Sequence, residues 1–234
     1  MIIFRGQDLE TVAPVKIADI HVSPIQRNIV ARDRPILAGA DFVRVSEGTR
    51  TVTITFSILE QNPIIRQQHL EAVTAWAVST VPGPMVLPYH QNRQLYVLCT
   101  GLPTPSARQW WESGLTLTFT AYDPYFRDEY TKEESCGTEF YVGGNAPPMM
   151  RIERTLNASA SNQSYSDGIN TMTFSTIPAG YMMINLNQER QTAQVDNTSI
   201  MPYFSLLSSF IVPKLGYMTI TGTGTVKWKE RWDA

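Results

Sequence analysis

Two stretches of the chain alternate apolar and polar residues with the two-residue period of a half-buried β-strand. In residues 50–59 the apolar positions are Val52, Ile54, Phe56 and Ile58, separated by threonine and serine. In residues 114–122 they are Leu115, Leu117, Phe119 and Ala121, separated by threonine. Asp123-Pro124 then stops the second strand, because proline has no N–H to give to a sheet. We expect this strand to close one domain.

The segment from residue 63 to about residue 80 predicts an amphipathic helix, with Asn62 as its N-cap and Pro63 in its first turn. At about 100° per residue, one side of this helix collects Ile65, His69, Ala72, Val73, Trp76 and Ala77. His69 has no second His or Cys three or four residues away. We therefore interpret it as a packing residue rather than a metal ligand or a base.

A hairpin is expected directly after the helix. Pro82-Gly83-Pro84 ends the helix, and residues 85–99 contain two apolar runs around a polar turn. His90 is expected at the solvated tip of that turn. Cys99 is expected to be a small buried hydrophobe.

Two other segments of the first half are candidates for contact with a partner. Residues 14–30 predict one or two short strands broken by prolines, and residues 31–40 then mix charge, proline and glycine. That second stretch is either an exposed arm or an ordinary long hairpin loop. Trp110 and Trp111 point to opposite faces if they lie in a strand, so one of them needs a cover from a loop, a subunit or a sugar.

The composition changes after Phe126, where six charges occur in residues 127–134 and a glycine- and proline-rich stretch follows. We expect two domains, 1–130 and 131–234, with residues 225–234 a candidate for packing back on the first. Short apolar pieces about ten residues apart predict a β-sandwich or jelly roll in the second. They include 171–174, 181–186, 192–195, 203–207, 210–212 and 217–221. The last strand, 225–232, is expected to place Val226, Trp228 and Trp232 on one face and Lys227, Lys229 and Arg231 on the other.

The chain is unusually poor in charge: 17% of its 234 residues are charged, against about 25% in typical domains. This deficit indicates either a surface that meets other protein or a β-protein whose faces carry hydroxyl groups. The formal net charge of −2 argues against general nucleic-acid affinity. Two cysteines without a motif are compatible with a reducing cytoplasm, and neither an apolar run long enough to span a bilayer nor a secretory signal is expected.

The sequence offers no recognisable catalytic, cofactor or metal motif, so we predict no enzyme activity and no cofactor. His21, His69 and His90 lie outside nucleophile–base motifs, and no G-x-S-x-G elbow occurs. The aspartates are too scattered for a metal site, and Gly143-Gly144 is not followed by a helix that could bind phosphate. Carboxylates that pair only in space, as in glycosidases, stay open.

The order of these elements resembles a known family. An Arg-led strand (50–56), an amphipathic helix ending near Trp76, a hairpin and a strand closing in Asp123-Pro124-Tyr125-Phe126 are similar to the N-terminal domain of the distal tail protein family of long, non-contractile-tailed phages. The second half looks like that family's galectin-like domain, with the aromatic and basic strand 227–232 at its end. The resemblance implies a mainly β fold: a β-sandwich-like N-terminal ring domain with one amphipathic helix, then a galectin-like β-sandwich.

The resemblance also implies a function. Such proteins form a homo-hexameric ring at the virion tail tip, between the tail tube protein and a hub protein of the tail-associated lysin type. The ring is a platform for receptor-binding proteins, and DNA passes through its lumen without specific binding; no membrane is involved. Because the segment from Arg32 to Arg44 is charged and exposed in character, we expect an inter-subunit arm there. Its candidate residues are Arg32, Asp33, Arg34, Asp41 and Arg44. The alternatives are a carbohydrate-binding module and a cell-wall glycoside hydrolase.

Overall fold

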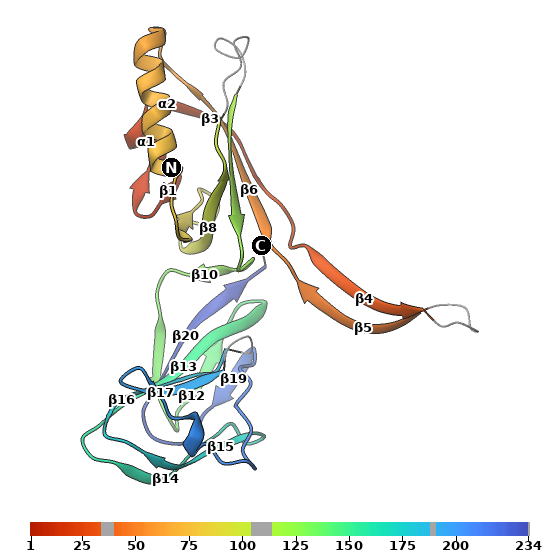
Figure 1. The fold of residues 1–234 in the computed structure, drawn as a ribbon, viewed down its shortest axis with the longest axis vertical. Coiled ribbons are helices and arrows are strands. Elements are labelled where there is room, and N and C mark those ends of the chain that lie inside the picture. The colour runs from red at the N-terminus through yellow and green to blue at the C-terminus, as the bar shows by residue number, and fades with distance from the viewer. Residues whose placement is uncertain (34–39, 104–113, 188–190, 234) are drawn as a thin grey trace. The chain divides into compact units, whose positions relative to one another are not determined.

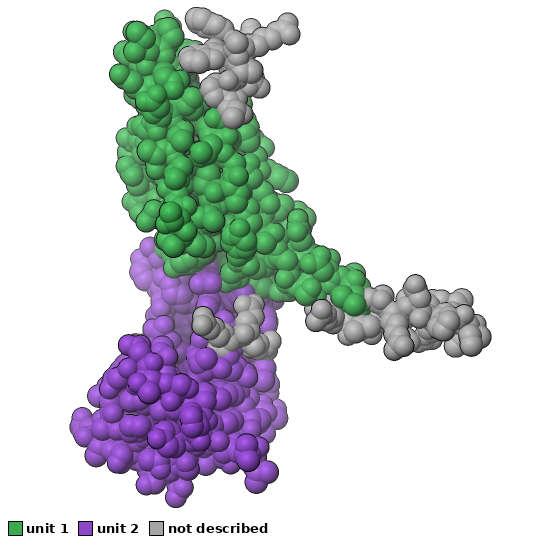
Figure 2. Space-filling model, viewed as in Figure 1, with its two compact units in different colours: residues 1–126 green, residues 127–234 purple. Residues whose placement is uncertain are grey.

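The computed structural model describes residues 1–33, 40–103, 114–187 and 191–233, with the backbone alone described at 31–33 and 40–45. The chain divides into two compact units, Met1–Phe126 and Arg127–Ala234, which are coloured separately in Figure 2. Both units are built mainly from antiparallel strands, so the predicted mainly β fold is confirmed.

Unit 1 is a curved antiparallel sheet with a helix and a long hairpin. Its described strands join in the order β3-β6-β9-β8-β7-β1-β2, while β4 and β5 pair with each other. The elements are β1 Ile3–Phe4, β2 Gln7–Asp8, α1 Leu9–Val12, β3 Val15–Val22, β4 Arg27–Asp33, β5 Ala40–Glu47, β6 Arg50–Ile58, α2 Pro63–Ala77, β7 Gly83–Val86, β8 Arg93–Gly101 and β9 Leu115–Ala121. Strand β10, Phe126–Asp128, lies where the two units join along the chain.

Strand β6 lies between β3 and β9 in this sheet, and one of its faces is buried, as its alternation predicts. Every second residue from Arg50 to Ile58 is buried, and β9 pairs with β6 so that Ile54 lies opposite Leu117. The apolar side chains on this face are removed from water, and this burial is the main stabilising contribution of a half-buried strand.

Helix α2 covers part of the core through Trp76, whose ring makes edge contacts with Phe4 and Phe119 at 5.6 and 6.2 Å between centroids. Its buried residues are Leu70, Val73, Trp76 and Ala77. Ile65, which was grouped with the apolar side, is 39% exposed at the start of the helix. His69 is half-buried on α2.

Both ends of α2 have local causes. The Asn62 side chain accepts a hydrogen bond from the Ile64 N–H at 2.9 Å, as expected of an N-cap. The helix ends at Ala77 rather than near residue 80, because Val78 takes an extended backbone conformation. The hydroxyl of Ser79 then bonds to the backbone of Val81 and fixes the exit turn.

The main sheet of unit 2 is antiparallel: β11 and β13 both pair with β20, and the order continues β13-β16-β17-β18. Two further pairs, β12–β19 and β14–β15, accompany it. The elements are β11 Lys132–Ser135, β12 Glu139–Val142, β13 Ala146–Leu156, β14 Ala160–Ser166, β15 Thr171–Ile177, β16 Gly180–Asn185, β17 Thr192–Val195, β18 Thr198–Ser199, η1 Met201–Tyr203, β19 Gly216–Thr219 and β20 Thr225–Trp232.

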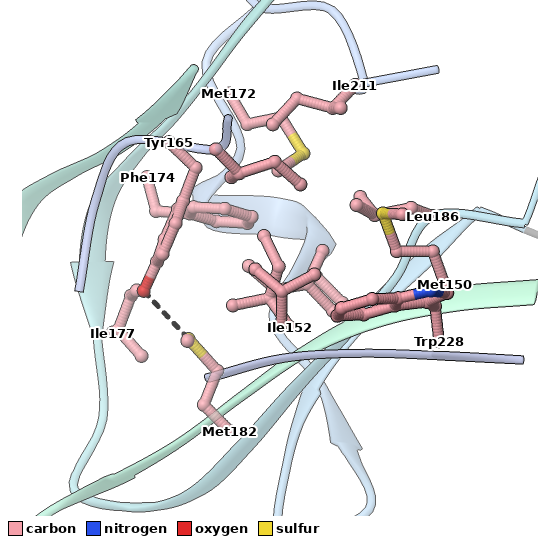
Figure 3. Packing of buried hydrophobic residues seen from close by; sticks show 14 of the residues in the cluster. Met150, Ile152, Tyr165, Met172, Phe174, Ile177, Met182, Leu186, Ile211 and Trp228 are labelled. Atoms are coloured by element: carbon pink, nitrogen blue, oxygen red, sulfur yellow. Dashed lines mark hydrogen bonds between the residues drawn. The ribbon is translucent and has the colours of Figure 1, made fainter. Parts of the chain in front are cut away.

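The core of unit 2 is rich in methionine and aromatic side chains (Figure 3). Tyr165 is buried with its hydroxyl directed at the sulfur of Met182, 3.9 Å away, and at the Thr223 carbonyl, 3.1 Å away. Trp228 stacks on Phe140 at 4.6 Å between ring centroids. The tryptophan of the last strand is therefore a core residue.

Two expectations for unit 2 were wrong. The apolar pieces 203–207 and 210–212 are not strands; η1 and irregular chain occupy this region, and Phe204 still reaches the core by contacting Phe174. In β20 the residues Glu230 and Arg231 are both buried, although the alternation predicted an outward-facing Arg231. The strand is covered on both faces near its end, so a period of two no longer separates inside from outside.

Candidate functional site

The β4–β5 hairpin is open to solvent on both of its faces near its base. Arg27, Asn28, Ile29 and Val30 are consecutive and all exposed, with Ile29 at 68%. Because successive residues of a strand point to opposite faces, neither face of the ribbon is covered here. Figure 1 shows β4 and β5 extending away from the body of unit 1.

The predicted arm falls on this hairpin. Arg32 and Asp33 belong to β4 and Asp41 and Arg44 to β5, and the backbone register pairs Arg32 with Asp41 and Val30 with Arg44. The strands were expected to end near residue 30, but the pairing continues through the described residues 31–33 and 40–42. Arg34 lies outside the described residues, as do Trp110 and Trp111. Contact of the arm with a neighbour stays a prediction.

Near the base of the hairpin, at the start of β6, Arg50 meets Phe126 of the closing segment. Arg50 begins β6 and is 1% exposed, and its guanidinium carbon lies 5.6 Å from the ring centroid of Phe126. The His90 ring lies 4.5 Å from the same Phe126 ring. Burial, followed by the charges of Arg93 and Arg50, lowers the pKa of His90. The expectation of a solvated His90 was therefore wrong: it packs on the closing segment.

Among the described residues, no three His, Cys, Asp or Glu side chains gather as they would around a metal ion. Cys99 is half-buried rather than buried, and burial raises the pKa of both Cys99 and Cys136. Each thiol is thus held in its protonated, weakly nucleophilic form. No helix in the described part of the chain is long and apolar enough to cross a membrane.

Unit 2 contains a network of paired charges that the sequence analysis missed. Glu153 of β13 is 8% exposed and lies 2.5 Å from Arg151 Nε and 3.0 Å from Lys227 Nζ. Burial alone would raise the pKa of Glu153, but hydrogen bonds from Tyr181 and Lys227 and the nearby cationic charges outweigh it, so the pKa is lowered. The network ties β13, β16 and β20 together.

A second buried carboxylate, Glu230, closes the end of β20. It accepts from Lys132 Nζ at 2.5 Å and from the Gly143 N–H at 2.8 Å. Burial would raise the pKa of Glu230, and these hydrogen bonds reverse the effect and lower it. Each of the two carboxylates is thus held in its charged form by structural partners.

Exposed apolar side chains form two further features of unit 2. Tyr141 of β12 and Tyr217 of β19 are cross-strand partners, 58% and 75% exposed, with ring centroids 5.2 Å apart. Leu206 and Leu207 are essentially fully exposed, at 102% and 100%. Contiguous apolar side chains of this kind commonly mark interaction sites.

Comparison with known proteins identifies a solved structure with the same fold. No family model matches the sequence, and no curated protein matches it significantly. The structure of the SPP1 Dit (gp 19.1) protein, described as a paradigm of hub adsorption apparatus in Gram-positive-infecting phages, matches with a TM-score of 0.74 and 16% identity over 98% of each chain.

Structures of the phage p2 baseplate in its activated conformation match less well. The form with Ca gives a TM-score of 0.48 and the form with Sr gives 0.43, each at 11% identity over 96% of this chain and 92% of the other. The predicted resemblance is confirmed at the level of fold: along nearly its whole length, this chain has the fold of the phage SPP1 Dit protein.

Proposed function

We propose that this chain is a structural protein of a phage tail tip. In this proposal six copies form a ring between the tail tube protein and the hub protein, and DNA passes through the lumen. The first domain, 1–130, makes the ring, and the second, 131–234, serves as a platform for host-adsorption components. The role is one of assembly and requires no reaction.

The observation that carries the proposal is that both faces of the β4–β5 hairpin are open to solvent at its base. An isolated two-stranded hairpin is at best marginally stable in water, and exposed ribbons of this kind invite pairing or packing with another chain. Ile29 and Val30 are apolar and exposed at its base, so a partner surface would gain by covering them. The Dit-like fold supports a neighbouring copy as that partner, because a repeated head-to-tail contact closes into a ring.

The test is the mass and shape of the purified chain with and without the arm. Replacing residues 29–45 by Asn-Gly joins Asn28 to Ser46, which are already paired, through a favoured two-residue turn. The wild type is expected to form six-fold rings in negative stain with a matching mass by mass photometry, and the shortened chain to remain monomeric and folded. Rings that persist without the arm, or a wild type that stays monomeric at high concentration, would refute the proposal.

A point substitution gives a matched control for the arm. Ile29→Arg places a charge on the hairpin, and Ile169→Arg places one at a similarly exposed apolar position of unit 2, at 75% against 68%. We expect only Ile29→Arg to weaken the ring. Equal effects would mean that added charge, not the arm, disrupts assembly.

One observation favours a second function, a carbohydrate-binding surface on unit 2. The register of β12 and β19 places Glu139 beside Thr219 on the same outward face as Tyr141 and Tyr217. Exposed aromatic rings with nearby polar groups suit an amphipathic ligand such as a sugar. Calorimetric titration with cell-wall polysaccharide tests it: binding by wild type that Tyr141→Ala and Tyr217→Ala abolish would support the function, and absence of heat would exclude it.

A further inference from the structure

Strand β15 has the composition of a segment that readily pairs with copies of itself. Its seven residues, Thr171–Ile177, include no charge, no proline and no glycine. Met172 and Phe174 point into the core of unit 2 (Figure 3), so Thr173 between them lies on the other face. Uncharged segments of about six or seven residues with high β-propensity are the ones that stack into sheets between molecules. With an open edge, β15 would be an association hazard.

One edge of β15 is paired with a strand, and the other is covered by irregular chain. Strand β14 pairs with β15 from one end to the other. Along the opposite edge runs the segment 203–209, which we call the strap. The Ser205 N–H donates to the Thr173 carbonyl at 2.9 Å, and the Ser209 N–H donates to the Thr171 carbonyl at 3.0 Å. The strap therefore occupies backbone groups that another strand would use.

The strap covers this edge without forming a strand of its own. The Thr173 N–H donates to the Ser208 hydroxyl at 2.9 Å, so a side chain takes the place of the backbone carbonyl that a strand would supply. The Ser208 N–H donates to the Ser205 carbonyl at 3.0 Å, which closes a β-turn within the strap. Because the chain turns here, it presents no straight row of N–H and C=O groups to a further strand.

Apolar packing holds both ends of the strap. The Phe204 ring lies 5.3 Å from the Phe174 ring and 4.9 Å from the Phe210 ring, measured between centroids. Just outside the strap, Ile200 and Ile211 are 1% and 0% exposed. The ends of the strap are thus fixed in the core of unit 2, while its middle is held to β15 by hydrogen bonds.

We propose that the strap prevents β15 from pairing with the same strand of a second copy. Natural sheets commonly protect an exposed edge with lysine, proline or a bulge, and β15 carries neither a charge nor a proline. Two copies that present the same uncovered edge can pair antiparallel about a two-fold axis. The strap blocks that pairing by using the edge first. This protection is independent of the proposed ring and limits the contacts that copies can make with one another.

Shortening the strap tests the proposal. Residues 205–209 are replaced by Gly-Asn-Gly, which removes the strap's donors and the Ser208 hydroxyl; a short link can join Phe204 to Phe210 because their rings stack at 4.9 Å. The parent chain already has Asn-Gly in place of residues 29–45, so contacts through the arm do not mask the result. Sedimentation velocity over a concentration series is expected to show dimers and larger species with rising thioflavin fluorescence, while the parent stays monomeric.

Two matched variants separate the edge of β15 from the exposed leucines of the strap. Leu206→Ser with Leu207→Ser changes side chains that are 102% and 100% exposed, keeps the hydrogen bonds to β15 and should stay monomeric. Thr173→Lys in the shortened chain places a charge on the uncovered edge and should restore the monomer. A shortened chain that stays monomeric at high concentration overturns the proposal. Association that persists with Thr173→Lys, or that appears in the leucine variant, also overturns it.

A milder change carries the test if the shortened chain loses its near-ultraviolet circular dichroism and is therefore not folded. Ser208→Ala removes only the acceptor of the Thr173 N–H. One hydrogen bond changes an opening equilibrium by about two- to tenfold, so hydrogen exchange at Thr173 and the rate of association should both rise by that factor. The control is Ser199→Ala, whose hydroxyl accepts from the Met201 N–H at 3.3 Å. Equal rates of association for these two variants would overturn the proposal.

Discussion

Removal of the Glu230 carboxylate offers the sharpest test of the packing described for unit 2. Glu230 is 5% exposed in β20 and holds two donors from distant parts of the chain, Lys132 Nζ and the Gly143 N–H. Glu230→Ala leaves both donors without this acceptor. Glu230→Gln keeps an oxygen for the Gly143 N–H but removes the negative charge.

The two donors contribute differently to the expected loss. A hydrogen bond to a charged group is worth about 1.5–3 kcal/mol, and the Gly143 N–H loses its acceptor in Glu230→Ala. The Lys132 side chain is 47% exposed and regains water, so its share is only about 0–1 kcal/mol. We expect Glu230→Ala to lower the free energy of unfolding by about 2–4 kcal/mol and Glu230→Gln by about 1–2 kcal/mol.

Differential scanning calorimetry and urea unfolding followed by tryptophan fluorescence measure these losses. A loss of about 3 kcal/mol should lower the melting temperature of a unit of this size by about 10 °C or more. The control is Glu133→Ala, whose carboxylate is 64% exposed and lies 3.4 Å from Lys227, and it should cost about 0–1 kcal/mol. If Glu230→Ala is no more destabilising than this control, the inference that the buried carboxylate holds the strand end is wrong.

Three further predictions concern other local features. The pKa of Glu153 is lowered in the folded chain, so its carboxylate contributes its full stabilisation above its ordinary pKa of 4.5, and this stabilisation is lost as the pH falls through the lowered folded value. The difference in free energy of unfolding between wild type and Glu153→Gln, measured in urea, should therefore become smaller below pH 4.5. Gly144 has φ +95, and a Cβ there would lie 2.4 Å from the Arg231 carbonyl oxygen. Gly144→Ala should therefore lower the free energy of unfolding by at least about 2–3 kcal/mol, as measured by calorimetry. The control is Gly137→Ala, where φ is +92 but a Cβ meets open space; an equal loss there would contradict the clash. Asn62→Ala should lower the free energy of unfolding by about 1 kcal/mol through loss of the α2 cap, whereas Asn62→Asp keeps an acceptor and should retain most of the cap's stabilisation. Equal melting temperatures for wild type and both variants would refute the capping role.

The fold could be predicted from the sequence where one face of an element is buried and the other is wet. Strand β6 follows its alternation from Arg50 to Ile58 without a break, and α2 begins where Asn62 and Pro63 indicate. In these elements the local pattern and the tertiary environment agree.

The sequence was less informative where that condition fails. The ribbon of β4 and β5 has no buried face at its base, so no alternation marked its full length, and residues 31–40 were left as either an exposed arm or a long hairpin loop. Glu230 is a charged residue in a strand covered on both faces, and its partner Lys132 is 98 residues away. Nothing local to either residue predicts their pairing. His90 was misplaced for the same reason, because its contact with Phe126 depends on tertiary structure.

The open base of the β4–β5 hairpin has a consequence for genetics and for engineering. Ile29 and Val30 are exposed, so polar substitutions there are expected to change the free energy of unfolding of the isolated chain very little. A screen that ranks variants by thermal shift would therefore miss any contact that these two residues make with another molecule. A constraint on the identity of Ile29 and Val30 would therefore come from a partner that covers them, because both side chains are exposed on the chain itself.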